Sequence, residues 1–285
     1  MNPVILIPFA TSEPWRNSAY QYVHDYYRRH FPKIPILLGH TSGEWSKGAA
    51  VADAYAHAGD ATELVIADAD SFLFDPQPLT RAIELVAAGI PWVVPHGNVY
   101  RLRPAETERL YREPTTSPRL GHTARAVYQG PPGGGISVVS RAAYDRVHGI
   151  DPSFLGWGGE DLAFGWALDT LAGPHTRLTG TLVHLWHPHP APKLRGSAES
   201  ETLVARYRSA RGVRRRMDAV IAGSSWSPPP ELPEPIRFRM TTNRTTLRLL
   251  SGENVTFTRG IYETVDADEV EQLRTFQILK EERRK

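Results

Sequence analysis

Short apolar runs alternate with longer helical stretches over the first 95 residues, and this alternation limits the folds open to the chain. Four runs have the length and apolar character of buried strands: residues 4–7, 34–38, 63–67 and 91–95. Three stretches with helical features separate them: residues 15–30, 46–58 and 78–88. Strands that alternate with helices of this length form right-handed βαβ units, so we predict an α/β fold around a mostly parallel sheet.

The pattern changes after residue 95. Residues 97–132 carry many Arg, Pro and Thr residues with little periodicity, so we expect long loops there. Beyond them, the sequence predicts strands at 136–140 and 182–186 and helices at 141–147, 160–171 and 200–222. The last helix carries six arginines, which we interpret as a solvated basic face; a face that binds phosphate or a partner is the alternative.

A proline-rich stretch at residues 224–235 divides the chain, and we predict that it is a semi-rigid linker. After it, strand-like segments at 236–240, 246–250 and 254–258 precede a helix at 266–276 and a charged, frayed tail at 280–285. We therefore predict a sheet domain at 1–223, a linker at 224–235 and a small β-rich accessory module at 236–285.

Composition excludes several classes of protein. The chain has 285 residues and no Cys, which rules out a disulfide scaffold and any Cys-ligated metal site. The 33 basic and 31 acidic residues give a net charge of +2, too balanced for a general nucleic-acid binder. No stretch is long and apolar enough for a membrane span, and the apolar start lacks the basic flank of a signal peptide. We therefore expect a cytoplasmic location.

Asp68 and Asp70 directly follow the apolar run at 63–67. In open α/β sheets, ligands bind just outside the carboxyl ends of the strands. Side chains two residues apart on a strand share a face, and two close carboxylates repel each other unless a cation lies between them. The pair therefore predicts a divalent metal site, for Mg²⁺ or Mn²⁺, with a turn or helix-capping role before Pro76 as the alternative.

A second motif surrounds Trp157, in the sequence Gly156-Trp157-Gly158-Gly159-Glu160-Asp161. The glycines allow the backbone to approach a ligand closely, the indole ring can stack on a sugar face, and carboxylates accept hydrogen bonds from sugar hydroxyls. The two acidic residues also begin a predicted helix, whose dipole favours negative charge there. The alternative is a glycine loop with ordinary carboxylates at a helix start.

Histidines form the third motif, at the end of the strand predicted at 182–186. His184 and His187 could present imidazole groups to a ligand or a metal ion. A surface or purely structural role is the alternative for either of them.

Taken in this order, the three motifs resemble nucleotide-sugar glycosyltransferases of the GT-A fold, in particular the galactosyltransferase C-terminal region and its family-2 relatives. The resemblance covers roughly residues 3–220. It implies a Rossmann-like GT-A domain and a hexosyltransferase that uses Mn²⁺ or Mg²⁺ and a nucleotide-sugar donor, expected to be UDP-linked. Asp70 matches the metal-binding Asp of these enzymes, and His184 or His187, with slight preference for His184, matches a further metal ligand.

The resemblance also assigns the remaining site residues. Those expected to bind the nucleotide sugar are Pro8, Phe9, Lys47, Asp53, Asp68, Gly134, Gly135 and Trp157. Asp161 matches the proposed general base of inverting members, and Glu160 matches a residue that binds the acceptor or donor sugar. Leu162 and Ala163 stand where the typical block continues with acidic residues, so the identity of the acceptor is not transferred.

Residues 252–257 and 260–264 faintly resemble strand-rich segments of tailed-phage structural proteins. This implies a phage-encoded enzyme in the host cytoplasm, which acts on a glycan or a protein acceptor and has a virion partner for residues 236–285. The alternative to an enzyme is a non-catalytic sugar-binding or virion-associated protein that reuses the fold. A metal-dependent nucleotidyltransferase or hydrolase is a third class, and the Trp157 motif argues against it.

Overall fold

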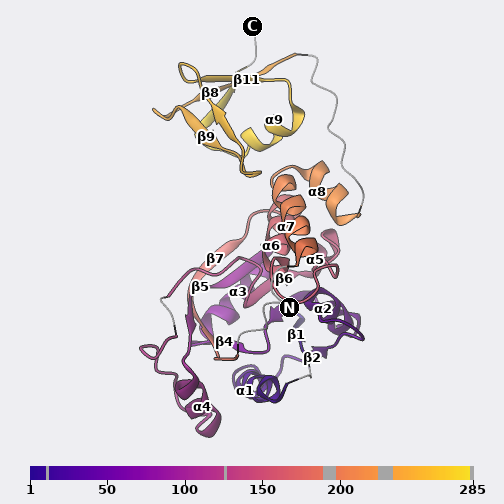
Figure 1. The fold of residues 1–285 in the computed structure, drawn as a ribbon, viewed down its shortest axis with the longest axis vertical. Helices are drawn as coiled ribbons and strands as arrows, with labels where there is room; N and C mark the ends of the chain where they lie inside the picture. Colours follow the sequence, from indigo (N-terminus) through magenta and orange to yellow (C-terminus); the bar gives the residue numbers. More distant parts are fainter. Residues whose placement is uncertain (11–12, 125–126, 189–196, 224–233, 283–285) are drawn as a thin grey trace. The chain divides into compact units, whose positions relative to one another are not determined.

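The computed structural model describes residues 1–10, 13–124, 127–188, 197–223 and 234–282. The chain forms two compact units, Met1–Val204 and Ala205–Lys285, and each is described by itself (Figure 1). Most of the predicted linker, residues 224–233, lies outside the described residues. The domain boundaries predicted at 223 and 235 stay a prediction.

The first unit is built on a seven-stranded sheet with the order β2-β1-β3-β6-β5-β7-β4. Its strands are β1 (Pro3–Pro8), β2 (Ile36–Gly39), β3 (Glu63–Ala67), β4 (Ser71–Leu73), β5 (Trp92–Arg101), β6 (Ile136–Ser140) and β7 (Thr176–His184). The pairings make β2, β1, β3, β5 and β7 run in one direction, whereas β6 and β4 run in the other. The predicted α/β class with a mostly parallel sheet is therefore confirmed.

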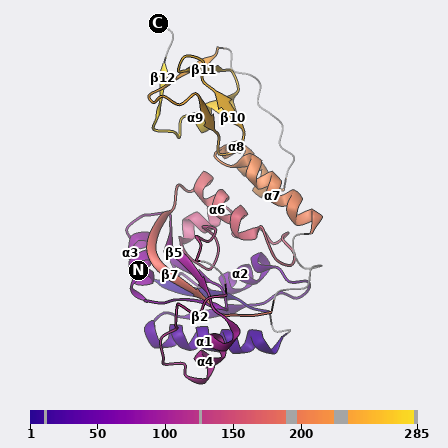
Figure 2. The ribbon, with the colours of Figure 1, turned by 60° about the vertical axis from the view of Figure 1, so that its left-hand side comes forward.

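Helices cover both faces of this sheet (Figure 2). They are α1 (Pro14–His30), α2 (Lys47–Ala56), α3 (Gln77–Ala87), α4 (Pro104–Arg112), α5 (Arg141–Arg146) and α6 (Glu160–Leu171). Ile5 and Ile7 of β1 pack in one apolar core with residues of α1, α3 and α4. Val4 and Leu6, which alternate with them, are also buried. Coverage on both sides explains why this strand is a continuous apolar run in the sequence.

Three predictions for this part of the chain were wrong. Residues 97–132 are not only loops, because they contain the end of β5 and all of α4. The strand expected at 182–186 begins earlier and ends at His184. The single helix expected at 200–222 is two helices, α7 (Ala198–Ala210) and α8 (Arg214–Ile221), and Gly212 between them has a φ of 79° that interrupts the helix.

The second unit contains the small β-rich module, as predicted. β8 (Ile236–Met240) lies between β11 (Ile261–Thr264) and β12 (Leu279–Glu282), and β9 (Thr246–Arg248) pairs with β10 (Asn254–Thr256). α9 (Ala267–Leu273) begins at the predicted cap Asp266, whose side chain accepts from two backbone N–H groups. The frayed tail that we expected at 280–285 was wrong for residues 280–282, because they belong to β12, which pairs with β8.

Part of the basic face of α8 is paired within the second unit. Arg215 and Arg216 donate to the two carboxylate oxygens of Asp268, at 2.9 and 2.7 Å. Asp268 is buried, so this interaction satisfies a charge that would otherwise be costly to hold inside the unit. The interpretation of a solvated basic face therefore fails for Arg216, whose side chain is only 17% exposed.

Among the residues that the structure describes, no helix combines the length and apolar character needed to cross a membrane.

Candidate active site

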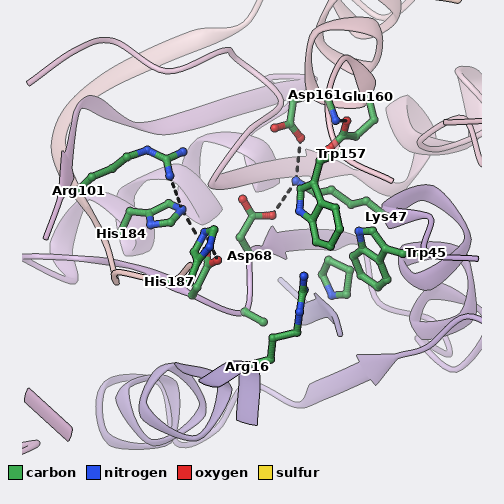
Figure 3. A pocket seen from close by; sticks show the side chains of 14 residues that line it. Arg16, Trp45, Lys47, Asp68, Arg101, Trp157, Glu160, Asp161, His184 and His187 are labelled. Atoms are coloured by element: carbon green, nitrogen blue, oxygen red, sulfur yellow. Dashed lines mark hydrogen bonds and ion pairs between the residues drawn. The ribbon is translucent and has the colours of Figure 1, made fainter. Parts of the chain in front are cut away.

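A cavity of about 460 Å³ opens beyond the carboxyl ends of β1 and β3 (Figure 3). This is the edge of the sheet where α/β proteins bind ligands. Nine of the residues predicted from the sequence line it: Pro8, Lys47, Asp68, Asp70, Trp157, Glu160, Asp161, His184 and His187. They come from five separate segments of the chain, which the fold brings together in one cavity.

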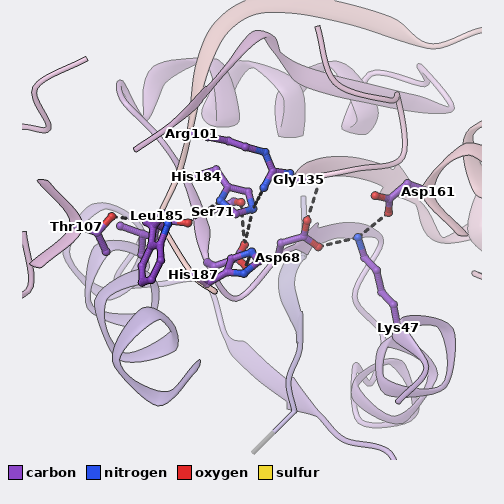
Figure 4. Close-up of polar contacts among 12 residues, drawn as sticks. Lys47, Asp68, Ser71, Arg101, Thr107, Gly135, Asp161, His184, Leu185 and His187 are labelled. Atoms are coloured by element: carbon purple, nitrogen blue, oxygen red, sulfur yellow. Dashed lines mark hydrogen bonds and ion pairs between the residues drawn. The ribbon is translucent and has the colours of Figure 1, made fainter. Parts of the chain in front are cut away.

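Asp68 and Asp70 lie in the cavity wall but contact different partners. β3 ends at Ala67, and a turn closes after it through a hydrogen bond from the Ser71 backbone N–H to the Asp68 carbonyl. The alternation of a strand therefore does not apply to the two side chains. Asp70 lies beside the histidines, whereas Asp68 lies beside Lys47 (Figure 4). The two carboxylates thus have different neighbours, and a cation held between them stays a prediction.

Asp70, His184 and His187 form a group whose ligand atoms all lie within 4.8 Å of one another. The Nε2 atoms of His184 and His187 are 3.7 and 3.5 Å from the two oxygens of the Asp70 carboxylate. Each histidine uses Nδ1 to hydrogen-bond a backbone carbonyl, at 2.6 Å for His184 and 2.8 Å for His187. This arrangement leaves the Nε2 lone pairs facing the carboxylate, which is how proteins orient imidazole ligands toward a metal.

Arg101 and Trp15 surround the histidines. The Nη1 group of Arg101 donates to Nε2 of His184 at 3.1 Å, which requires that nitrogen to be an acceptor. Burial lowers the pKa of His184, and this also favours the neutral imidazole that binds metals. Trp15 stacks on the ring of His187, with the two centroids 4.8 Å apart and the planes 13° from parallel.

Lys47 lies between two further carboxylates of the cavity, those of Asp68 and Asp161. Its Nζ atom lies 2.6 Å from Oδ1 of Asp68 and 2.7 Å from Oδ1 of Asp161. The lysine is the first residue of α2, which is fixed by the N-cap Ser46 and by close packing of Gly48 against the backbone of Ile150. Although burial opposes the charge, Asp161 and Asp68 raise the pKa of Lys47 above its ordinary value, so it stays an ammonium group.

Asp161 lies in the first turn of α6 and faces the glycine loop at 133–135. Burial raises its pKa to about 7, against the opposing effect of Lys47. A side chain at Gly134 would place its Cβ 2.7 Å from Oδ2 of Asp161, so this close approach requires glycine. A partly buried carboxylate with a pKa near 7 is suited to accept a proton at neutral pH.

Aromatic and cationic side chains form the wall opposite the sheet. Arg16 reaches into the cavity from α1, and its guanidinium carbon lies 4.6 Å from the centre of the Trp157 ring (Figure 3). Trp45 lies on the other side, with its ring centre 6.3 Å from that of Trp157. Glu160 accepts a hydrogen bond from the backbone N–H of Gly158 at 3.0 Å, which helps to fix the loop that carries the indole.

Four predicted residues lie outside the cavity lining. Phe9 is buried against Tyr20, and Asp53 is exposed and accepts from the backbone N–H of His40 at 2.9 Å. Gly134 and Gly135 support the lining instead, because the Gly135 N–H donates to Oδ2 of Asp68 at 3.0 Å.

The sequence reasoning missed three residues of the lining, Arg16, Trp45 and Arg101. Arg16 lies in a stretch for which we predicted only a helix, and Arg101 lies in a segment that we expected to be a loop. The pairing of β5 with β7, which places Arg101 opposite His184, has no local signature in the sequence. Trp45 lies two residues before Lys47, which we expected to bind the donor, and this proximity in the sequence was the available signal.

Residues 125–180 match the family model described as the N-terminal domain of galactosyltransferase. No curated protein matches the chain. Among solved structures, the catalytic domain of Drosophila beta1,4galactosyltransferase 7 in complex with xylobiose is similar at 14% identity and a TM-score of 0.45. That match covers 95% of this chain and 96% of the other.

Two further structures are similar over most of this chain. GalNAc-T7 with UDP, GalNAc and Mn²⁺ has 11% identity and a TM-score of 0.46, covering 92% of this chain and 66% of the other. Mannosyltransferase PcManGT from Pyrobaculum calidifontis, with GDP-Man and Mn²⁺, has 14% identity and a TM-score of 0.41, covering 80% and 66%. The family match over residues 125–180, which contain the glycine loop and the Trp157 motif, confirms the predicted resemblance to galactosyltransferases.

Proposed function

We propose that the chain is a metal-dependent glycosyltransferase that moves a sugar from a UDP-linked donor to an acceptor hydroxyl with inversion at the anomeric carbon. One observation carries the proposal: a single cavity brings the Asp70–His184–His187 group together with the partly buried carboxylate of Asp161. The first suits a divalent cation beside a diphosphate, and the second suits removal of a proton from a hydroxyl group.

The three side chains fit a metal ion. They offer one carboxylate oxygen and two imidazole nitrogens, and both histidines are held with Nε2 toward Asp70. This mixed oxygen and nitrogen set favours Mn²⁺ over Mg²⁺, because Mg²⁺ prefers oxygen ligands and bound water. When bound, the ion would stabilise the negative charge of the departing diphosphate.

The protein residues have separate tasks in this reaction. Asp68, with Pro8 at the end of β1, binds the donor, and Trp157 stacks on a sugar ring. Asp161 takes the proton of the acceptor hydroxyl as that oxygen attacks the anomeric carbon; the bond from that carbon to the diphosphate breaks on the opposite face. Glu160 holds the loop of Trp157 and contributes to sugar binding. The acceptor is a hydroxyl of a glycan or a protein.

A donor screen tests this proposal. Purified protein with Mn²⁺ is incubated with UDP- and GDP-linked hexoses, and release of the free nucleotide is measured with and without EDTA. We expect release from a UDP-linked hexose that EDTA suppresses, and NMR of the product should show the anomeric configuration inverted. Binding of donors without any release would contradict an enzyme and favour the non-catalytic sugar-binding alternative. A retained configuration would reject Asp161 as the base.

The phage origin, the location in a host cytoplasm and the virion partner for residues 236–285 stay predictions. A pull-down with the isolated chain from a lysate of phage-infected cells, followed by identification of the bound proteins, would test the partner.

A further inference from the structure

Lys47 occupies a position that the proposed transfer reaction does not by itself require. The metal ligands lie on one side of the cavity, and Lys47 lies on the other, between the donor-binding and the proton-accepting carboxylates (Figure 4). Its side chain is only 8% exposed, so water screens these two contacts weakly. This ammonium group lies within 3 Å of two carboxylates, and its charge favours the ionised form of Asp161.

The two oxygens of Asp161 have different surroundings. Oδ1 accepts a hydrogen bond from Lys47 at 2.7 Å, whereas Oδ2 lies above Gly134, where the chain provides no side chain. The contact with Lys47 therefore fixes the rotation of the carboxylate and places the other oxygen close against the glycine loop. The Asp161 side chain lines the cavity and is 24% exposed, so an acceptor hydroxyl that enters the cavity meets a carboxylate whose orientation Lys47 sets.

The charged groups that face Asp161 come from three elements. Lys47 extends from α2, Glu160 precedes Asp161 in α6, and Asp68 follows β3. Burial and the two carboxylates favour the protonated form of Asp161, and the ammonium group of Lys47 opposes them. Lys47 is thus the group among these that favours an ionised base.

We propose that Lys47 is a positioning residue that keeps Asp161 ionised and oriented for proton removal, and that links it to the donor-binding Asp68. The inference rests on the proposed function for the identity of the base. Two substitutions should therefore shift the pKa of Asp161 in opposite directions. Loss of the Lys47 ammonium group should raise that pKa. Loss of the Asp68 charge should lower it, because Lys47 then interacts with Asp161 alone.

The direct measurement is the pKa of Asp161 in the free protein. Carboxyl ¹³C NMR of protein labelled at Asp, in EDTA and without donor, gives the titration curves, and Asp161→Asn identifies the resonance. In Lys47→Met we expect the pKa of Asp161 to rise by about 1–3 pH units. Lys47→Arg should largely preserve it, Asp68→Asn should lower it, and the exposed Lys33→Met should leave it unchanged.

Activity gives the second measurement. The acid limb of kcat/KM against pH should move upward in Lys47→Met by the same amount and should return in Lys47→Arg. A wild type that turns over no donor would contradict the proposed function, and the NMR titration would still test Lys47. An unchanged pKa and an unchanged acid limb in Lys47→Met, with normal wild-type turnover, would overturn the inference alone.

A second variant is needed if circular dichroism shows that Lys47→Met is unfolded. The double variant Lys47→Met, Asp68→Asn removes one charge of each sign and takes its place. The pKa of Asp161 should be higher in this double variant than in Asp68→Asn, and an equal pKa would overturn the inference.

Discussion

The two sides of the cavity treat their carboxylates differently. Asp70 faces two imidazole groups with their lone pairs directed toward it, so we propose that this side is arranged to receive an exchangeable metal ion. Asp68 and Asp161 share the permanent cation of Lys47. The comparison shows how one small cavity separates a charge supplied by an exchangeable ion from a charge supplied by the chain. The first can vary with metal supply, and the second cannot.

The largest expected effect comes from removing the carboxylate of the metal side. Asp70→Ala should abolish the Mn²⁺-dependent part of UDP binding, because it takes away the charged ligand of the group. Calorimetry of UDP binding, with and without Mn²⁺, measures this. The exposed Asp25→Asn is the matched control, and Mn²⁺-dependent UDP affinity that survives in Asp70→Ala would place the metal elsewhere.

Removal of the base on the lysine side should be nearly as severe for turnover while sparing binding. Asp161→Asn should lower kcat by about 10²–10⁴-fold, the usual contribution of a positioned base. The affinity for UDP with Mn²⁺ should change little, because Asp161 lies apart from the Asp70 group. Steady-state kinetics and calorimetry separate the two effects, and turnover equal to that of the wild type would reject the assigned role.

The pH dependence should follow Asp161 rather than the metal side. Its pKa is raised to about 7, and the ionised form is the active one, so activity is present above this pH and is lost as the pH falls through it. Below that pH, kcat/KM should fall about tenfold for each pH unit. The profile is measured at saturating Mn²⁺, so that the histidines do not contribute, and activity that rises as the pH falls below 7 would contradict the assignment.

The smallest effect concerns Arg101, the cation nearest to the histidines. Its Nη1 group occupies the lone pair of His184, and its charge opposes an incoming metal ion. Arg101→Met should therefore strengthen Mn²⁺ binding by about two- to fivefold, the size of a partly solvated charge interaction. Titration with Mn²⁺ followed by electron paramagnetic resonance measures it, and Arg103→Met is the control. Weaker binding would mean that Arg101 helps to orient His184.

The predictable parts of the fold are those buried on both faces or marked by a clear start signal. β3 was predicted over its full length. All five of its residues are buried, four of them are apolar, and the carboxylate of the fifth, Glu63, accepts hydrogen bonds from Asn2 and Thr62. α6 was predicted because Gly159, with a φ of 98°, precedes two acidic residues. α4 was missed because its buried side includes Glu106, held by an ion pair with Arg109, so its inner face looks polar in the sequence.

The site residues that follow strand ends could be predicted from the sequence. The contacts between them could not, because they depend on how distant segments pack. Asp68, Asp70 and His184 lie at or just beyond strand ends, and the sequence placed them in the site. Their division between two sides depends on the turn after Ala67, which shifts Asp70 toward β7. The bridging role of Lys47 depends on how α2 packs against residues 150–152, a contact between segments far apart in the sequence.

The stacking of Trp15 on His187 has a practical consequence. An indole ring in face-to-face contact with a proposed metal ligand should make the intrinsic fluorescence of the protein responsive to the ion. Mn²⁺ is paramagnetic and quenches a fluorophore at contact distance, whereas Mg²⁺ is not and does not. Trp15 is one of seven tryptophans, so the signal is the Mn²⁺-dependent loss of emission that disappears in Trp15→Phe. This difference should distinguish the two ions by light alone, without nucleotide, sugar or turnover.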